Sequence, residues 1–168
     1  MSYWELNQSL LLDKSPPNLI RSQQIEKCFQ PVTFVAMVRN PYVHCEALMR
    51  RDRMTAEQAA RLVLQCLRHQ KRNQEQLQNI LLVRYEDLVK SPGKIKKQLL
   101  AFLPKLESIK IDQKFRAHNY TQEQQKIMDF NQGKIERIKP HQLKTINSIF
   151  VEEETLLHFF NYNLNLGS

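Results

Sequence analysis

Residues 31–48 read PVTFVAMVRNPYVHCEAL, an apolar run that ends abruptly at Arg39. Val32–Val38 has the length and the β-branched and aromatic content of a buried strand. Pro31 cannot donate a ladder hydrogen bond, so it suits the entrance of that strand. Arg39 is then the first residue past the carboxyl end of the strand, which is where ligands bind in open α/β sheets. We therefore expect Arg39 to lie at a ligand-binding edge.

The two residues after Arg39 predict the start of a helix. Asn40 is a good N-cap, and Pro41 fits the first helical position. A helix N-terminus offers free N–H groups to an anion, and an arginine fork beside them suits a phosphate monoester. These residues alone leave an alternative open, in which Arg39 simply pairs with a carboxylate at a strand-to-helix junction.

Two further apolar runs predict strands that also end in charged residues. Leu10–Leu12 precedes Lys14 and a double proline, which pushes the chain out of the α region. Ile80–Val83 precedes the sequence Arg-Tyr-Glu-Asp. If these strands are parallel, Lys14 and Arg39 overhang the same edge of the sheet.

Amphipathic stretches between and after these runs predict helices. Thr55 and Gln58 have the spacing of a capping box, and the stripe that follows is long enough for a crossover between parallel strands. The other expected helices begin at residues 16–17, 41, 91, about 121 and 140, and the one near residues 121–129 is short. The last is one long helix or two helices broken near Val151. The pattern predicts an α/β fold, with a mostly parallel sheet of three or more strands flanked by helices on both faces.

Length and composition set further bounds. The chain of 168 residues suits one domain over residues 1–168. Its three cysteines lack metal-ligand spacing, so we expect neither a disulfide framework nor a metal site. No apolar run is long enough for a membrane span, and we expect a cytoplasmic protein.

The formal net charge of +8 predicts attraction to polyanions. The basic residues cluster at 50–53, 68–72 and 94–97. No stacking aromatics or DNA-binding motifs accompany them, so solvated helix faces explain these clusters better than nucleic acid does.

Several titratable residues have a structural explanation. We expect Glu86 and Asp87 to cap a helix or pair with a cation, since adjacent residues at a strand end point in different directions. Cys45 is expected to be a small buried residue. The five histidines show no pairing that indicates a catalytic base; they are His44, His69, His118, His141 and His158.

Three segments, taken in order, resemble the sulfotransferases that use 3'-phosphoadenosine 5'-phosphosulfate (PAPS). They are Lys-Ser-Pro-Pro-Asn at 14–18, Val-Arg-Asn-Pro at 38–41 and Val-Arg-Tyr-Glu-Asp-Leu at 83–88. The resemblance covers most of residues 8–164 and implies a P-loop-like fold. It also implies that Arg39 binds the 3'-phosphate of PAPS or its product PAP, that Tyr85 lies near the adenine, and that Lys14 is catalytic and reaches toward the sulfuryl group.

The chain departs from that family at three points. The Gly/Ser/Thr-rich loop that cradles the 5'-phosphosulfate, and the strand before it, have no counterpart. Ala47 stands where a serine usually helps to bind the 3'-phosphate. Pro16 stands where many cytosolic members carry a catalytic histidine.

These features leave two functions open. The first is a sulfotransferase, or the C-terminal part of one, that moves a sulfuryl group from PAPS to a hydroxyl or amine of a carbohydrate or small molecule. The second is a noncatalytic module that binds nucleotides or polyanions on the same scaffold. Because a first strand is missing, we also expect an exposed sheet edge, covered by a homo-oligomer contact or by the chain's own N-terminal residues.

Overall fold

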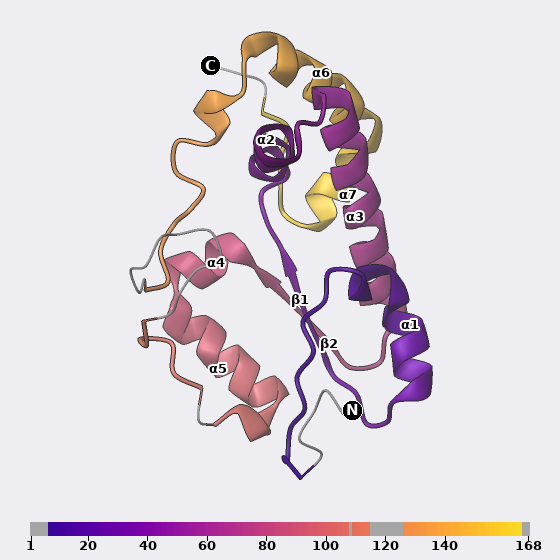
Figure 1. Cartoon of the computed structure of the whole chain (residues 1–168), viewed down its shortest axis with the longest axis vertical. Helices are drawn as coiled ribbons and strands as arrows, with labels where there is room; N and C mark the ends of the chain where they lie inside the picture. Colours follow the sequence, from indigo (N-terminus) through magenta and orange to yellow (C-terminus); the bar gives the residue numbers. More distant parts are fainter. Residues whose placement is uncertain (1–6, 108, 115–125, 166–168) are drawn as a thin grey trace.

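Two parallel strands run through the middle of the molecule (Figure 1). The computed structural model describes residues 7–107, 109–114 and 126–165. β1 (Phe34–Val38) pairs with β2 (Ile80–Arg84) in a register that matches Phe34 with Ile80 and Val38 with Arg84. The two strands therefore end side by side, and the residues that follow them leave the sheet at the same edge.

The connection between the strands starts as the sequence predicts. α2 (Pro41–Asp52) has Asn40 as its N-cap, whose side-chain oxygen accepts hydrogen bonds from the N–H groups of Tyr42 at 2.9 Å and Val43 at 3.3 Å. The helix ends at Arg53, which adopts the left-handed conformation with a φ of 55°. Because α2 begins three residues after the last residue of β1, its first turn lies at the carboxyl edge of the sheet.

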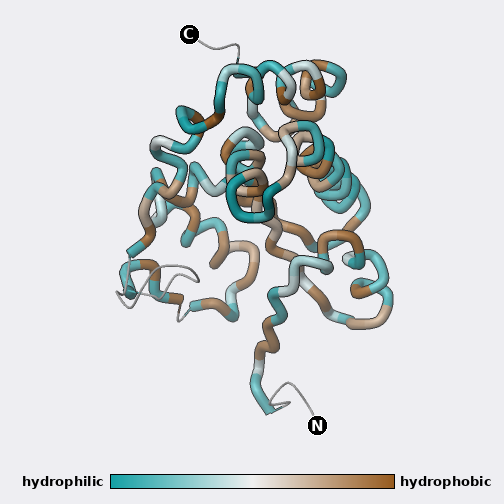
Figure 2. Tube along the Cα trace, turned by 45° about the horizontal axis from the view of Figure 1, so that its top comes forward, coloured by the Kyte–Doolittle hydropathy of each residue, from teal (hydrophilic) through white to brown (hydrophobic). Residues whose placement is uncertain are grey.

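α3 (Ala56–Gln76) is the longest helix among the described residues. The predicted capping box is confirmed: the Thr55 hydroxyl accepts from the N–H of Gln58, and the Gln58 side chain accepts from the N–H of Thr55. Figure 2 shows mainly hydrophilic residues on the outer side of this helix. Its buried stripe, which includes Ala59 and Val63, faces the core.

We expect Thr55→Ala to lower the free energy of unfolding by about 1 kcal/mol, because it leaves an N–H group of the first turn without its acceptor. Urea unfolding followed by circular dichroism measures this loss. Thr55→Ser keeps the hydroxyl and should remain close to the wild type. An alanine variant as stable as the serine variant would contradict the role of the cap.

The remaining helices flank the strands and close the upper end of the molecule. In Figure 1, α1 and α3 lie on one side of the strands, and α4 and α5 lie on the other. A short 3-10 turn separates α6 from α7, so the chain takes the second of the two predicted forms, with a break at Val151. The bounds are α1 (Asn18–Cys28), α4 (Tyr85–Lys90), α5 (Pro92–Phe102), α6 (Pro140–Phe150) and α7 (Glu154–Phe159), with 3-10 turns at Pro104–Leu106, Ile135–Arg137 and Val151–Glu153.

The main hydrophobic core lies where α2, α3, α6 and α7 meet. Tyr42 and Phe150 form its aromatic centre, with ring centroids 5.2 Å apart in an edge-to-face arrangement. Both side chains are almost completely buried. The C-terminal helices thus fix the position of α2, and with it the start of the helix beside Arg39.

The predicted strand at Leu10–Leu12 is wrong. These residues form no ladder with another described segment, and Leu12 is 80% exposed. The segment runs up past the strands, where Figure 2 shows part of it as hydrophobic. Apolar character indicates a strand only if a neighbour supplies the hydrogen bonds, and here the described sheet has two strands instead of three or more.

One other prediction falls partly outside the described residues. Of the short helix expected near residues 121–129, positions 121–125 are not described, and positions 126–129 are not helical. None of the helices in the described ranges is long and apolar enough to cross a membrane.

Candidate functional site

Arg39 and Tyr85 meet at the carboxyl edge of the sheet. Val38 and Arg84 are partners in the ladder, so the next residue of each strand leaves the sheet beside the other. The central carbon of the Arg39 guanidinium lies 4.4 Å from the centroid of the Tyr85 ring. The structure therefore brings together the two residues that the sequence analysis assigned to nucleotide binding.

Residues 128–131 hold this pair in place; we call them the 128–131 segment. Arg39 donates from Nε to the side-chain oxygen of Asn131 at 2.6 Å, and from Nη2 to the carbonyl of Phe130 at 2.9 Å. The Tyr85 hydroxyl donates to the carbonyl of Met128 and accepts from the N–H of Phe130, both at 2.9 Å. An arginine carries five N–H donors, so the outer edge of the Arg39 fork keeps donors for a ligand.

Glu86 joins three parts of the chain next to this pair. One carboxylate oxygen accepts from the N–H of Asn40 and from the side-chain amide of Asn131, both at 2.8 Å. The other accepts from the hydroxyl of Tyr162 at 2.8 Å. Burial and the Glu86 carboxylate raise the pKa of Tyr162, so this hydroxyl stays protonated and donates. The neighbouring Asp87 approaches Arg84 at 3.9 Å, so the expected pairing with a cation is confirmed for Asp87. Glu86 instead accepts hydrogen bonds from neutral groups and neither caps α4 nor pairs with a cation among the described residues.

A hollow of about 470 Å³ opens beside the 128–131 segment. Its cationic lining residues are Arg50, Lys134 and Arg137. Burial lowers the pKa of Lys134, and the nearby positive charge of Arg39 adds to this effect. Positive charges gathered around Lys134 mark a place where an anion would be stabilised.

A buried carboxylate holds two of these cations. Glu46 is 4% exposed, and its Oε1 accepts from Nε of Arg50 at 2.9 Å and lies 3.9 Å from Nη1 of Arg137. Its Oε2 is buried without a hydrogen-bond partner among the described residues. Arg39 and the hollow together bring four cations close to one another, and three carboxylates lie beside them, so an excess of positive charge remains; the carboxylates are Glu46, Glu86 and Asp129.

No sequence motif indicates that Arg50, Lys134 and Arg137 belong to this site. Arg50 lies in a basic cluster that predicts a solvated helix face, and the other two lie in a polar stretch without a motif. The one local signal is Gly133, whose φ of 67° turns the chain just before Lys134. Their approach to Arg39 depends on contacts between distant parts of the sequence.

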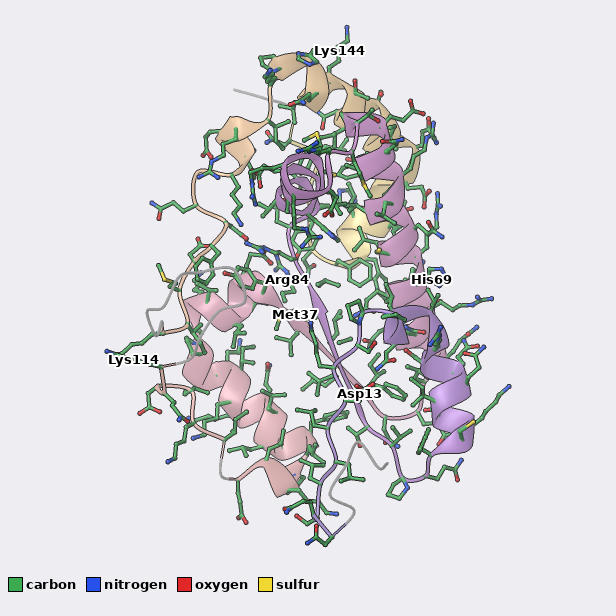
Figure 3. The ribbon with its side chains drawn as sticks, in the orientation of Figure 1. Asp13, Met37, His69, Arg84, Lys114 and Lys144 are labelled. Atoms are coloured by element: carbon green, nitrogen blue, oxygen red, sulfur yellow. The ribbon has the colours of Figure 1, made fainter. Side chains whose placement is uncertain are left out.

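Lys14 lies apart from this group. It is exposed, and within the described chain it forms no hydrogen bond or ion pair. Figure 3 labels Asp13, its neighbour, toward the lower half of the strands, whereas Arg84 marks their carboxyl end. The Leu10–Leu12 segment does not form the strand that would have carried Lys14 to the same edge as Arg39.

His44 gives the site region a pH dependence. Burial lowers its pKa, and the charges of Arg39 and Arg51 lower it further, while Asp52 acts in the opposite direction. The unfolded chain therefore binds the His44 proton more readily than the folded chain. The stability from neutral His44 is present above its unfolded pKa, near 6.5, and is lost as the pH falls through its folded pKa.

We therefore expect the free energy of unfolding to rise between about pH 5 and 7, and to rise less in His44→Gln. Urea unfolding at several pH values measures both slopes. The exposed His141→Gln is the matched control and should keep the slope of the wild type. A His44→Gln slope equal to that of the control would contradict the assignment.

The structure is an α/β scaffold with a cationic, arginine-centred candidate site at the carboxyl ends of its two described strands. Residues 2–107 match the model of the sulfotransferase family. The chain belongs to this family, and the matched region contains both strands and the Arg39–Tyr85 pair. Comparisons with curated proteins and with solved structures found no match. No group of His, Cys, Asp and Glu that could hold a metal occurs among the residues described.

Proposed function

We propose that the site around Arg39 binds PAPS, or its product 3',5'-ADP (PAP), and that the protein takes part in sulfuryl transfer to an acceptor hydroxyl or amine. The observation that carries this proposal is the fixed guanidinium of Arg39, whose outer edge is left with donors beside a cation-lined hollow. A phosphate monoester fits such a fork because it accepts two parallel hydrogen bonds.

The surroundings of Arg39 support a role in binding. Its stacking on Tyr85 and its two hydrogen bonds to the 128–131 segment restrict its rotamers before a ligand arrives. Less side-chain entropy is then lost on binding, which favours affinity. We assign the 3'-phosphate to Arg39 and the adenine to the neighbourhood of Tyr85.

We propose Lys14 as the catalytic residue. In sulfuryl transfer, the acceptor oxygen or nitrogen bonds to sulfur and releases its proton to water, while the bond from sulfur to the bridging oxygen breaks and that oxygen gains negative charge. A lysine ammonium beside this oxygen would stabilise the charge. The role requires the 10–17 segment to carry Lys14 to the bound nucleotide.

The separation of Lys14 from Arg39 favours a second candidate function. With the nucleotide cations assembled and the lysine apart, the chain would serve as a noncatalytic module that binds nucleotides or polyanions. Transfer of ³⁵S from labelled PAPS to a panel of carbohydrates, phenols and amines separates the two. Transfer above background that Lys14→Ala abolishes supports the enzyme, and nucleotide binding without transfer supports the module.

Binding itself is tested by calorimetric titration with two isomers of equal charge, 3',5'-ADP and 2',5'-ADP. A site built around Arg39 should prefer the 3'-phosphate, and the preference should persist at higher salt. Equal affinities that fall steeply with salt would instead indicate a nonspecific cationic surface and overturn the proposal.

We also propose a cytoplasmic location and a covered sheet edge. On β1, Val35 and Met37 are 48% and 51% exposed, which leaves apolar surface beside the sheet. Self-association, or coverage by the N-terminal residues, would remove it from water. Sedimentation velocity should then show an oligomer, or the N-terminal residues should be protected from proteolysis; a monomer with an accessible N-terminus would contradict this expectation.

A further inference from the structure

Glu86 occupies a central place that a helix-capping role does not explain. Its carboxylate accepts hydrogen bonds from the backbone of Asn40, from the amide of Asn131 and from the hydroxyl of Tyr162. Two of these three partners lead directly to Arg39. Asn40 is the next residue in the chain, and Asn131 accepts the hydrogen bond from Nε of Arg39.

The donors and acceptors in this chain of contacts permit one arrangement. Arg39 can only donate, so the oxygen of the Asn131 amide must face it. The ionised Glu86 can only accept, so the nitrogen of the same amide must face the carboxylate. Without Glu86, nothing on that side specifies which way the amide points, and a flipped amide would set two donors against each other.

We infer that Glu86 is a positioning residue for Arg39: it orients the Asn131 amide and the start of α2 so that the arginine fork faces the anion. The predicted effect of Glu86 on nucleotide affinity rests on the proposed function. The predicted effect of Glu86 on the geometry of Arg39 is independent of that function and can be observed in the free protein.

The negative charge of Glu86 should by itself weaken anion binding, so its hydrogen bonds and its charge can be tested separately. A carboxylate near an anion site repels the anion, so a residue retained only for its charge would weaken binding. Glu86→Gln removes the charge but keeps an oxygen for Asn40 and Asn131, and its amide nitrogen can donate to Tyr162. Glu86→Ala removes every hydrogen bond. The glutamine variant should therefore hold Arg39 as the wild type does and bind the nucleotide at least as tightly, whereas the alanine variant should do neither.

The direct test is the NMR signal of the Arg39 Nε–H group in the free protein. A hydrogen bond to a fixed Asn131 should give a sharp, slowly exchanging signal in the wild type and in Glu86→Gln. Glu86→Ala should broaden the signal or shift it toward that of a solvent-exposed arginine. Tyr162→Phe is the matched control: it removes a hydrogen bond from Glu86 without touching Asn131, and it should leave the signal unchanged.

Nucleotide titrations supply the second readout. Glu86→Ala should weaken binding of 3',5'-ADP about tenfold and change that of 2',5'-ADP little, because the loss acts through the fork for the 3'-phosphate. A double-mutant cycle identifies the route. If Glu86 acts through the amide, Asn131→Ala with Glu86→Ala should lose no more affinity than Asn131→Ala alone.

These experiments test the proposed function and the positioning role of Glu86 separately. A wild type without preference for the 3'-phosphate would overturn the proposed function, whereas the NMR comparison would still decide the role of Glu86. An unchanged Arg39 signal in Glu86→Ala, an equal loss for both nucleotides, or additive losses in the cycle would each overturn the positioning role. If Glu86→Ala does not fold, Asn131→Ala must reproduce the altered signal and Glu86→Gln must keep the native one, and failure of either overturns it.

Discussion

Arg39→Ala is expected to weaken the binding of 3',5'-ADP by roughly tenfold to 150-fold, the usual range for a lost charge-assisted hydrogen-bond pair. The guanidinium is already held by Tyr85, Phe130 and Asn131, so its removal takes away a preformed fork. Calorimetric titration of the wild type and the variant measures the change, with 2',5'-ADP as the reference ligand of equal charge.

Two further variants make the Arg39 test specific. Arg39→Lys should recover only part of the affinity, because a point charge cannot supply two parallel hydrogen bonds. Arg61→Ala removes the same charge from the exposed side of α3, where Arg61 pairs with Glu57 at 2.9 Å, and it should bind like the wild type. Equal affinity of Arg39→Ala and Arg61→Ala would show that net charge alone attracts the nucleotide.

Phe150→Ala is expected to lower the free energy of unfolding by about 3–5 kcal/mol, the range for a fully buried phenylalanine. Phe150 is 0% exposed and packs edge-to-face on Tyr42, so its removal opens a cavity at the centre of the core. Urea unfolding measures the loss. The next residue, Val151, is 55% exposed, and Val151→Ala should stay within about 0.5 kcal/mol of the wild type. Similar losses of unfolding free energy in both variants would contradict the position of Phe150 in the core.

The elements that the sequence predicted correctly have their signals within a few residues. The apolar run at β1, the Asn40-Pro41 start of α2 and the Thr55–Gln58 capping box are each settled by neighbours in the chain. Leu10–Leu12 has the same apolar signal as β1 but does not form a strand. A strand is completed by a partner elsewhere in the molecule, and local composition does not report whether that partner is there.

In the candidate site too, residues with a local sequence signal could be predicted and residues without one could not. Arg39 and Tyr85 could be placed together because each follows a strand, and parallel strands share an edge. Asn131, Lys134 and Arg137 could not, because no local pattern shows that the chain returns to this edge after α5. The sequence predicted the edge at which Arg39 and Tyr85 meet, whereas the partners that orient this arginine emerged only from the fold.

The hydrogen bonds of Arg39 join residues that are 91 and 92 positions apart. Contacts over such a span close a large loop, so they form after the local structure of the helices and the β1–β2 pairing. A nucleotide that strengthens them should act mainly on the unfolding step, since contacts absent from the folding transition state change the unfolding rate and leave the folding rate unaltered. Stopped-flow unfolding should therefore slow as 3',5'-ADP is added while refolding keeps its rate, and a cell would gain from the ligand a longer-lived protein, without faster folding.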